Sequence, residues 1–116
     1  ILTVSCPADQ TEAFCQDQAT IDAAFATWLA GFTYSGGCTV TEVGNTGTAP
    51  DYCGGSVTIN YSTSDDCGQT ANCSATFTVE PAPILTVSCP ADQTEAFCQD
   101  QATIDAAFNT WLAGFT

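Results

Sequence analysis

The sequence predicts a mainly β fold, in which a small, disulfide-stapled β-sandwich with one inserted amphipathic α-helix is repeated along the chain. Three observations lead to this prediction. Residues 84–116 copy residues 1–33 with a single change, from Ala26 to Asn109. Several short stretches alternate apolar and polar residues, as half-buried strands do. The first 83 residues carry six cysteines, an even number that is typical of a disulfide framework in a small domain.

The repeat defines the expected domain organisation. Ile84 takes the place of Ile1, so the period is 83 residues, a common size for one domain. A fixed period is the mark of a tandem array. We therefore expect residues 1–83 to form one complete module, and residues 84–116 to be the first part of a second, truncated module. Residues 80–83 (Glu-Pro-Ala-Pro) are expected to form a short, semi-rigid linker, because proline favours extended chain.

The module is expected to begin with a strand and then a helix. Residues 1–6 alternate with a period of two, and Pro7 ends this strand. Residues 18–31 are expected to be helical because apolar residues recur there at helical spacing. This apolar stripe consists of Ile21, Phe25, Trp28, Leu29 and Phe32. We expect it to pack in the core rather than to present Trp28 to a ligand, and position 26 to face solvent because it accepts both Ala and Asn.

Strands are expected to form the rest of the module. Three stretches alternate and are rich in β-branched and aromatic residues. These stretches are Cys38–Val43, Ser56–Tyr61 and Ser74–Val79. Turn-forming residues at 45–47 and 65–68 separate them, and short strands joined by turns favour a sandwich over a barrel. The second copy is expected to repeat the first strand and the helix.

The charge of the chain excludes several classes of function. It holds 13 acidic residues and no Lys, Arg or His, which gives a net charge of −13. Binding to nucleic acid requires cations that neutralise phosphates, and binding to anionic lipid surfaces also depends on them. The sequence has no apolar run of about 20 residues that would span a bilayer. We therefore expect no nucleic-acid partner and no membrane insertion.

All the cysteines of a complete module are expected to form disulfides. Those of the first module are Cys6, Cys15, Cys38, Cys53, Cys67 and Cys73, and the second copy begins the same set with Cys89 and Cys98. A zinc site is the alternative, but the chain has no His and no C-x-x-C spacing. A Cys53–Cys67 bond is disfavoured, because the strand between these residues spans roughly 20–25 Å.

We expect no enzymatic activity. Without His, Lys or Arg, proton transfer near neutral pH would depend on carboxylates alone, and no facing pair can be identified from the sequence among Glu12, Asp22, Glu42, Asp51, Asp65 and Asp66. No cofactor is expected. Asp65 and Asp66 are the candidate ligands for calcium, which prefers oxygen ligands. A solvated turn is the simpler interpretation of this pair, because no D-x-D-x-D-G loop is present.

Residues 57–79 carry a more specific pattern. They read VTINYSTSD, then a Cys-Gly turn, then Cys73 and a strand that ends in Phe-Thr-Val. This pattern resembles the closing half of a hyalin-repeat (HYR) domain, and Cys6-Pro7 resembles the opening Cys-Pro of that family. The whole period, with its helix and additional cysteines, is still more similar to the HYR-like repeats of very large surface proteins of gliding, Bacteroidota-type bacteria, which include gliding-motility adhesins.

The resemblance implies an immunoglobulin-like sandwich, a secreted and extracellular location at the cell surface, and an adhesive or filament-forming role. It also implies calcium near module junctions, where Glu80 would join Asp65 and Asp66. It further implies a Cys6–Cys73 disulfide. The four other cysteines of the module can then pair as Cys15–Cys53 with Cys38–Cys67, or as Cys15–Cys67 with Cys38–Cys53.

Two hypotheses for the function follow. The first is a non-catalytic structural repeat of an extracellular adhesin or surface filament, with neighbouring repeats and other filament subunits as its partners. The alternative is a carbohydrate- or surface-binding module that acts on surface glycans by avidity. An exposed aromatic platform would favour the alternative, whereas burial of Trp28 and Phe32 would count against it.

Overall fold

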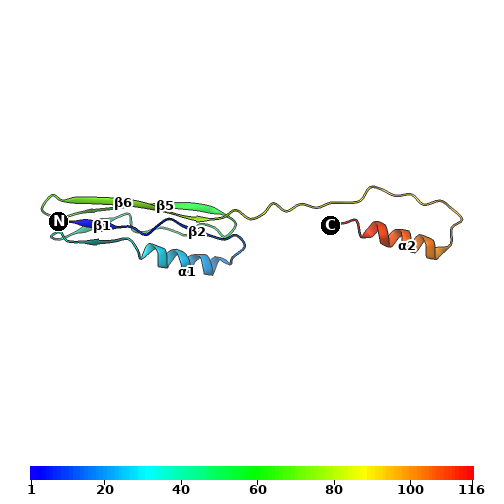
Figure 1. Cartoon of the computed structure of the whole chain (residues 1–116), viewed down its shortest axis with the longest axis horizontal. Helices are drawn as coiled ribbons and strands as arrows, with labels where there is room; N and C mark the ends of the chain where they lie inside the picture. Colours follow the sequence, from blue (N-terminus) through cyan, green and yellow to red (C-terminus); the bar gives the residue numbers. More distant parts are fainter. The chain divides into compact units, whose positions relative to one another are not determined.

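The computed structural model describes all 116 residues. The chain divides into two compact units, unit 1 (Ile1–Pro83) and unit 2 (Ile84–Thr116), and Figure 1 shows the elements of each. The division coincides with the end of the 83-residue period. Unit 1 contains six strands and one helix, and unit 2 contains one helix.

The strands of unit 1 form two sheets. Their bounds are β1 Thr3–Ser5, β2 Gln10–Glu12, β3 Thr33–Ser35, β4 Thr41–Val43, β5 Gly55–Ser64 and β6 Thr70–Val79. One sheet pairs β1 with β3, and the other has the strand order β2-β6-β5-β4. The β2–β6 pair is parallel and the remaining pairs are antiparallel. The opening segment of the chain therefore contributes one strand to each sheet.

A long hairpin of β5 and β6 forms the centre of unit 1. Its register runs from the pair Gly55–Val79 to the pair Ser64–Thr70 beside the turn. Successive side chains of a strand point to opposite faces. The residues on the inner face are largely apolar and turn towards the helix, and the residues on the outer face are Ser, Thr and Asn.

Helix α1 (Gln18–Leu29) starts at a side-chain cap. The carboxylate of Asp17 accepts a hydrogen bond from the backbone N–H of Thr20 at 2.8 Å, which satisfies one of the free N–H groups of the first turn. Gly31 follows the helix. A Cβ atom at this position would lie 2.9 Å from the Cβ of Pro7, so the close approach of the two segments requires glycine here.

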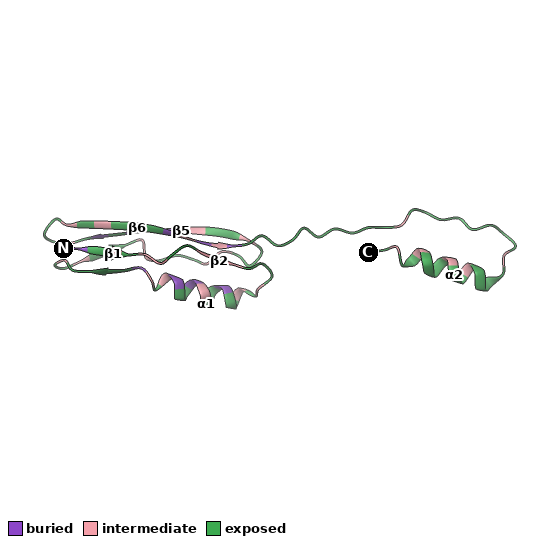
Figure 2. Ribbon diagram, in the orientation of Figure 1, coloured by how far each residue is buried: buried purple, intermediate pink, exposed green.

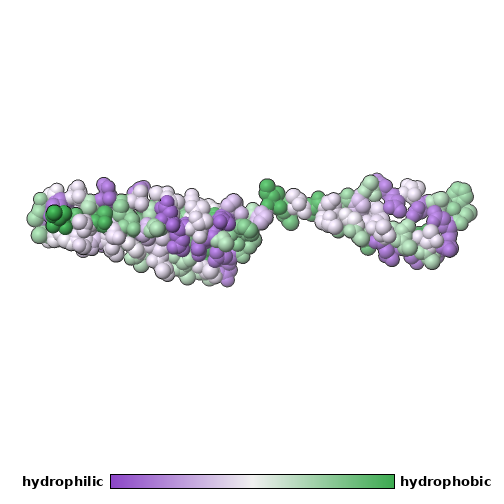
Figure 3. Space-filling model, in the orientation of Figure 1, coloured by the Kyte–Doolittle hydropathy of each residue, from purple (hydrophilic) through white to green (hydrophobic).

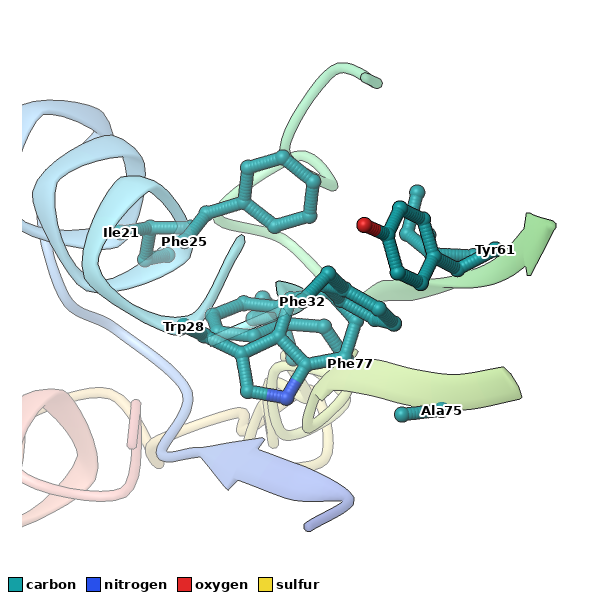
Figure 4. Close-up of a cluster of buried hydrophobic side chains, with 9 residues drawn as sticks. Ile21, Phe25, Trp28, Phe32, Tyr61, Ala75 and Phe77 are labelled. Carbon is teal, nitrogen blue, oxygen red and sulfur yellow. The ribbon is translucent and has the colours of Figure 1, made fainter. Parts of the chain in front are cut away.

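The core lies between α1 and the hairpin, as Figure 4 shows. The ring of Phe77 meets Phe25 edge-on at 5.3 Å and lies 5.5 Å from Trp28, measured between ring centroids. Phe32 packs on Tyr61 at 5.8 Å. The buried members of this core are Ile21, Phe25, Trp28, Phe32, Ile59, Tyr61, Ala75, Phe77 and Val79.

The structure confirms a β-rich chain with an amphipathic helix that faces the core. Four members of the predicted apolar stripe are buried and Leu29 is partly buried, while position 26 is exposed, as expected. The helix ends at Leu29, two residues before the predicted end. The strands β2 and β3 were not predicted, because each has only three residues and depends on a partner that is distant in the sequence.

Unit 2 contains only helix α2 (Gln101–Leu112), which is capped by Asp100 as α1 is capped by Asp17. No residue of α2 is buried, and Figure 2 shows this contrast with α1. The expected strand at the start of the second copy does not form. Ser88 and Thr116 exchange two backbone hydrogen bonds, of 2.7 and 2.9 Å. In unit 1 the equivalent pair, Ser5 and Thr33, is the first of the three pairs that join β1 to β3.

Candidate functional site

Four of the six acidic side chains that were considered for catalysis, those of Asp22, Glu42, Asp51 and Asp65, make hydrogen bonds to neutral groups. Glu42 accepts from the hydroxyl of Tyr61 at 2.5 Å. Asp22 accepts from the side-chain amide of Gln18 at 2.9 Å. Asp51, in a loop, accepts from the backbone N–H two residues later. These contacts serve the helix, the sheet and a turn, and none of them joins two carboxylates into an acid–base pair.

Both carboxylate oxygens of the calcium candidate Asp65 accept hydrogen bonds at the turn between β5 and β6. One carboxylate oxygen accepts from the backbone N–H groups of Cys67 (3.0 Å) and Gln69 (2.8 Å). The other accepts from the N–H of Cys38 (3.1 Å) and from the Gln69 amide (2.8 Å). Burial acts to raise the pKa of Asp65, but the hydrogen bonds from Gln69, Cys38 and Cys67 hold it below its ordinary value. The carboxylate therefore holds the turn together.

The two other calcium candidates lie apart from this carboxylate. Asp66 is exposed beside it, and its N–H donates to the carbonyl of Cys38 at 3.0 Å. Glu80 follows the far end of β6, about 30 Å along the strand from the turn. No group of three or more Asp, Glu or Cys side chains is arranged to hold a metal ion. Unit 1 thus does not bring the three candidates into one site.

One disulfide joins the start of unit 1 to its last strand. Cys6 bonds Cys73 across a sequence separation of 67 residues, with the two Cα atoms 6.2 Å apart. This is the pair that the HYR resemblance implies. The six other cysteines are free thiols on the surface: Cys15, Cys38, Cys53, Cys67, Cys89 and Cys98.

Two of the free cysteines lie together at the turn end of the hairpin. The backbone N–H groups of Cys38 and Cys67 bind the same Asp65 carboxylate. In addition, the carbonyl of Cys38 accepts from Asp66, the residue before Cys67. The segments that carry these two thiols are therefore fixed against each other.

Two more free cysteines lie at the opposite end of the hairpin. A hydrogen bond with Asp51 and burial raise the pKa of the Cys53 thiol, and the nearby Cys15 thiol adds a smaller contribution of the same sign. The side chain of Gln18 holds the two segments in place. Its amide donates to the carbonyl of Pro50 at 3.0 Å, and its oxygen accepts from the N–H of residue 52 at 2.9 Å.

Unit 2 exposes the apolar face that unit 1 buries. Phe108, Phe115 and Leu85 are 54, 47 and 91 % exposed, whereas the corresponding positions of unit 1 are 4, 5 and 5 % exposed. A pocket lined by Ile104, Phe108 and Trp111 opens on this face, and Figure 3 shows strongly hydrophobic residues on the chain that follows unit 1. In unit 1 the hairpin of β5 and β6 covers the corresponding face.

Sequence reasoning placed Asp65 correctly in a turn, but it missed the hydrogen bonds that the carboxylate accepts from the N–H of Cys38 and from the Gln69 side chain. It also missed the hydrogen bond from the indole N–H of Trp28 to the carbonyl of Ala8, at 2.8 Å. The Asp-x-x-Gly-Gln order of residues 65–69 is the available signal for the turn, since Asp commonly binds backbone N–H groups two or more residues later.

Comparison of this chain with protein-family models, curated proteins and solved structures gives no match. Neither helix has the length and apolar character needed to cross a bilayer.

Proposed function

We propose that residues 1–83 form a non-catalytic structural module of a tandem array in an extracellular adhesin or surface filament. The observation that carries this proposal is the difference between the two copies. None of the counterparts of the buried helix residues of unit 1 is buried in unit 2, where no such hairpin is present. Residues 84–116 are therefore the opening of a second module, and that module needs a hairpin of its own.

The hairpin of unit 1 cannot serve the second copy in place of the first. The opening strand begins beside the start of β6, where the N–H of Leu2 donates to the side chain of Gln69. Val79, at the end of β6, lies about 30 Å from that point. Thr86, the counterpart of Thr3, follows Val79 by seven residues, which span at most about 25 Å. The chain thus enters a module at one end and leaves it at the other, and this geometry builds a head-to-tail array.

Further features support an immunoglobulin-like sandwich in an extracellular setting. The opening segment contributes a strand to each of two sheets, and a disulfide ties it to the last strand. Disulfides persist in oxidising compartments such as the cell exterior. The net charge of −13 favours solubility and discourages separate chains from associating without a specific contact.

We also propose that the remaining thiols of the module pair as Cys15–Cys53 and Cys38–Cys67. Each pair lies at one end of the hairpin, and the ends are about 30 Å apart. A disulfide requires Cα atoms within about 7 Å, so the crossed pairing does not fit this fold. Peptic digestion at acidic pH followed by mass spectrometry will map the bonds, and a peptide that joins Cys15 to Cys67 would contradict the assignment.

The array is tested by adding a second copy of residues 34–83 after Thr116, in a Trp28→Phe background that leaves Trp111 as the only indole. The added hairpin should bury Trp111, so its emission should shift to the blue and its quenching by acrylamide should fall. The matched control carries the Phe77→Ala change in the added copy, which removes the ring at the centre of the core. Unchanged exposure of Trp111 in the extended chain would refute the proposal.

The outer face of the hairpin supports a second candidate function, the binding of surface glycans. Its ten side chains are all hydroxyls or amides, and none is charged: Ser56, Thr58, Asn60, Ser62, Ser64, Thr70, Asn72, Ser74, Thr76 and Thr78. Apart from the contact between Thr58 and Thr76, these side chains make no hydrogen bond to the protein. Trp28 and Phe32 are only 4 and 5 % exposed, so an aromatic platform on α1 does not contribute.

This polar face is small. Two strands of about 30 Å offer about 300 Å², well below the roughly 800 Å² that each partner buries in a standard protein interface. One module would therefore bind a neutral polysaccharide weakly, and repetition would supply avidity. Co-sedimentation with cellulose or chitin tests this candidate. The variant Asn60→Asp/Asn72→Asp should lose binding and the control Asn109→Asp should retain it, whereas equal retention by both would dismiss the polar face.

A further inference from the structure

We propose that the Cys6–Cys73 disulfide makes the module a nearly inextensible link that transmits tension along a short covalent path. This inference rests on the proposed array, because tension reaches both ends of a module only where modules are joined end to end. It adds a mechanical role that the array by itself does not require.

The disulfide connects the two strands that carry the ends of the module. Cys6 directly follows β1, and Cys73 lies within β6. The covalent path through the module therefore consists of residues 1–6, the disulfide and residues 73–83. Residues 7–72, which include α1 and β5, form a closed loop that bears no tension along its backbone.

The length of this path sets how far a module can stretch. Residues 1–6 and 73–83, with the 6.2 Å between the bonded Cα atoms, extend to about 60 Å at most. Without the bond, all 83 residues extend to about 300 Å. Since β6 itself spans about 30 Å, a module that loses its fold under load lengthens about twofold with the disulfide and about tenfold without it.

The directions of the strands also make the folded module resist unfolding under tension. Tension pulls β1 and β6 in opposite directions along their own axes, because the chain enters beside the start of β6 and leaves at its end (Figure 1). The hydrogen bonds of β1 to β3 and of β6 to β5 run across the strands. Several bonds in each ladder must therefore break together, and the strands cannot be peeled apart one residue at a time.

The four other cysteines of unit 1 leave this path unchanged. All of them lie within residues 7–72, so a bond between any two of them closes a smaller loop inside the unloaded one. While the Cys6–Cys73 bond is intact, it alone sets the extension. Reduction removes this bond together with any bond inside the loop, which makes the inference testable.

The test is single-molecule pulling on the full chain through handles at its two termini. With the disulfide intact, unfolding of unit 1 should leave residues 7–72 unreleased. Addition of dithiothreitol after folding should release about 240 Å of further contour length. Because unit 1 alone produces this difference, the result does not depend on whether a second module completes itself.

Two variants complete the design. With Cys15, Cys38, Cys53 and Cys67 also replaced by Ser, so that no other disulfide shortens the path, Cys73→Ser should give the long extension without a reductant. The reduced wild-type chain supplies the same comparison if this variant fails to fold. Cys89→Ser, which has the sequence context of Cys6 but no partner, should behave as wild type. The inference is overturned if the oxidised chain releases the full length, or if thiol titration of the unreduced chain finds Cys6 and Cys73 free.

Discussion

Replacement of Trp28 by alanine should remove a large part of the stability of unit 1. The indole is 4 % exposed and contacts three aromatic rings, those of Phe25, Phe32 and Phe77. Its N–H also donates to the carbonyl of Ala8 at 2.8 Å and thereby ties the helix to the opening segment. Truncation to a methyl group deletes all of these contacts.

The expected loss is about 4 kcal/mol. A large aromatic side chain buries up to about 250 Å², which at about 25 cal/mol per Å² is worth up to about 6 kcal/mol. Area burial overestimates the effect, because the unfolded chain already covers part of this surface, and measured truncations of buried aromatic residues cost about 3–5 kcal/mol. Domains are stable by only about 5–15 kcal/mol, so Trp28→Phe provides a milder variant that should keep the fold.

The chain contains its own control for this measurement. Trp111 occupies the same place in the second copy, with the same neighbours along the helix, but α2 has no buried residue. Urea unfolding of the oxidised chain, followed by circular dichroism, should show a large fall in the unfolding free energy for Trp28→Ala and none for Trp111→Ala. If both variants shift the transition equally, or if the Trp28→Ala loss is below about 1 kcal/mol, the core assignment is wrong.

Two further predictions concern ionisation. Burial, with the hydrogen bond to Glu42, raises the pKa of Tyr61 to about 12. The protonated phenol should therefore stabilise the fold below pH about 10, and this contribution should be lost as the pH rises towards 12. The step in ultraviolet absorbance near pH 12, which reports ionisation of this phenol, should be absent in Tyr61→Phe. The lowered pKa of Asp65 has the opposite consequence. The contribution of Asp65 to stability is present above pH about 4 and is lost in acid. Asp65→Asn should therefore destabilise the chain at pH 7 and make its stability depend less on pH in the acid range. A variant with the wild-type unfolding curve would show that the turn does not need the carboxylate.

The helix could be predicted because its signal is local. The apolar spacing and the cap both lie within 17–32, and the second copy forms the same helix although no hairpin covers it. The loop before the helix is local too. Cys15 and its copy Cys98 both adopt a left-handed backbone, with φ angles of 64° and 65°. No composition rule predicts that conformation for cysteine, so it was missed although the sequence encodes it twice.

The sequence predicted the strands that became β1 and β4 but missed β2 and β3, because a short strand forms only where a partner pairs with it. Residues 3–5 form a strand in unit 1, where residues 33–35 pair with them, and the identical residues 86–88 form none in unit 2. The same dependence applies to the cysteines. The spacing in the sequence left two disulfide pairings open for the four remaining cysteines of the module. Only the fold distinguishes them, because it places Cys53 and Cys67 at opposite ends of the hairpin.

A chain with 13 acidic residues and no basic side chain has to stabilise its fold without salt bridges between side chains. The structure shows how its carboxylates contribute instead. Asp17 and Asp100 cap the helices and Asp65 closes the hairpin turn, each by accepting backbone N–H groups. The side chain and then the backbone N–H of Thr20 and of Thr103 lower the pKa of Asp17 and Asp100. Burial acts to raise the pKa of Asp65, but its hydrogen bonds from Gln69, Cys38 and Cys67 lower it. A group with a lowered folded-state pKa stabilises above its unfolded pKa and fails in acid. These contacts are short-range, and the remaining carboxylates repel one another over distances that salt screens. Added salt should therefore stabilise this fold, and acid should weaken it at the caps and the turn. A fall in stability on raising the ionic strength at pH 7 would show that attractive charge pairs, which the sequence does not provide, matter after all.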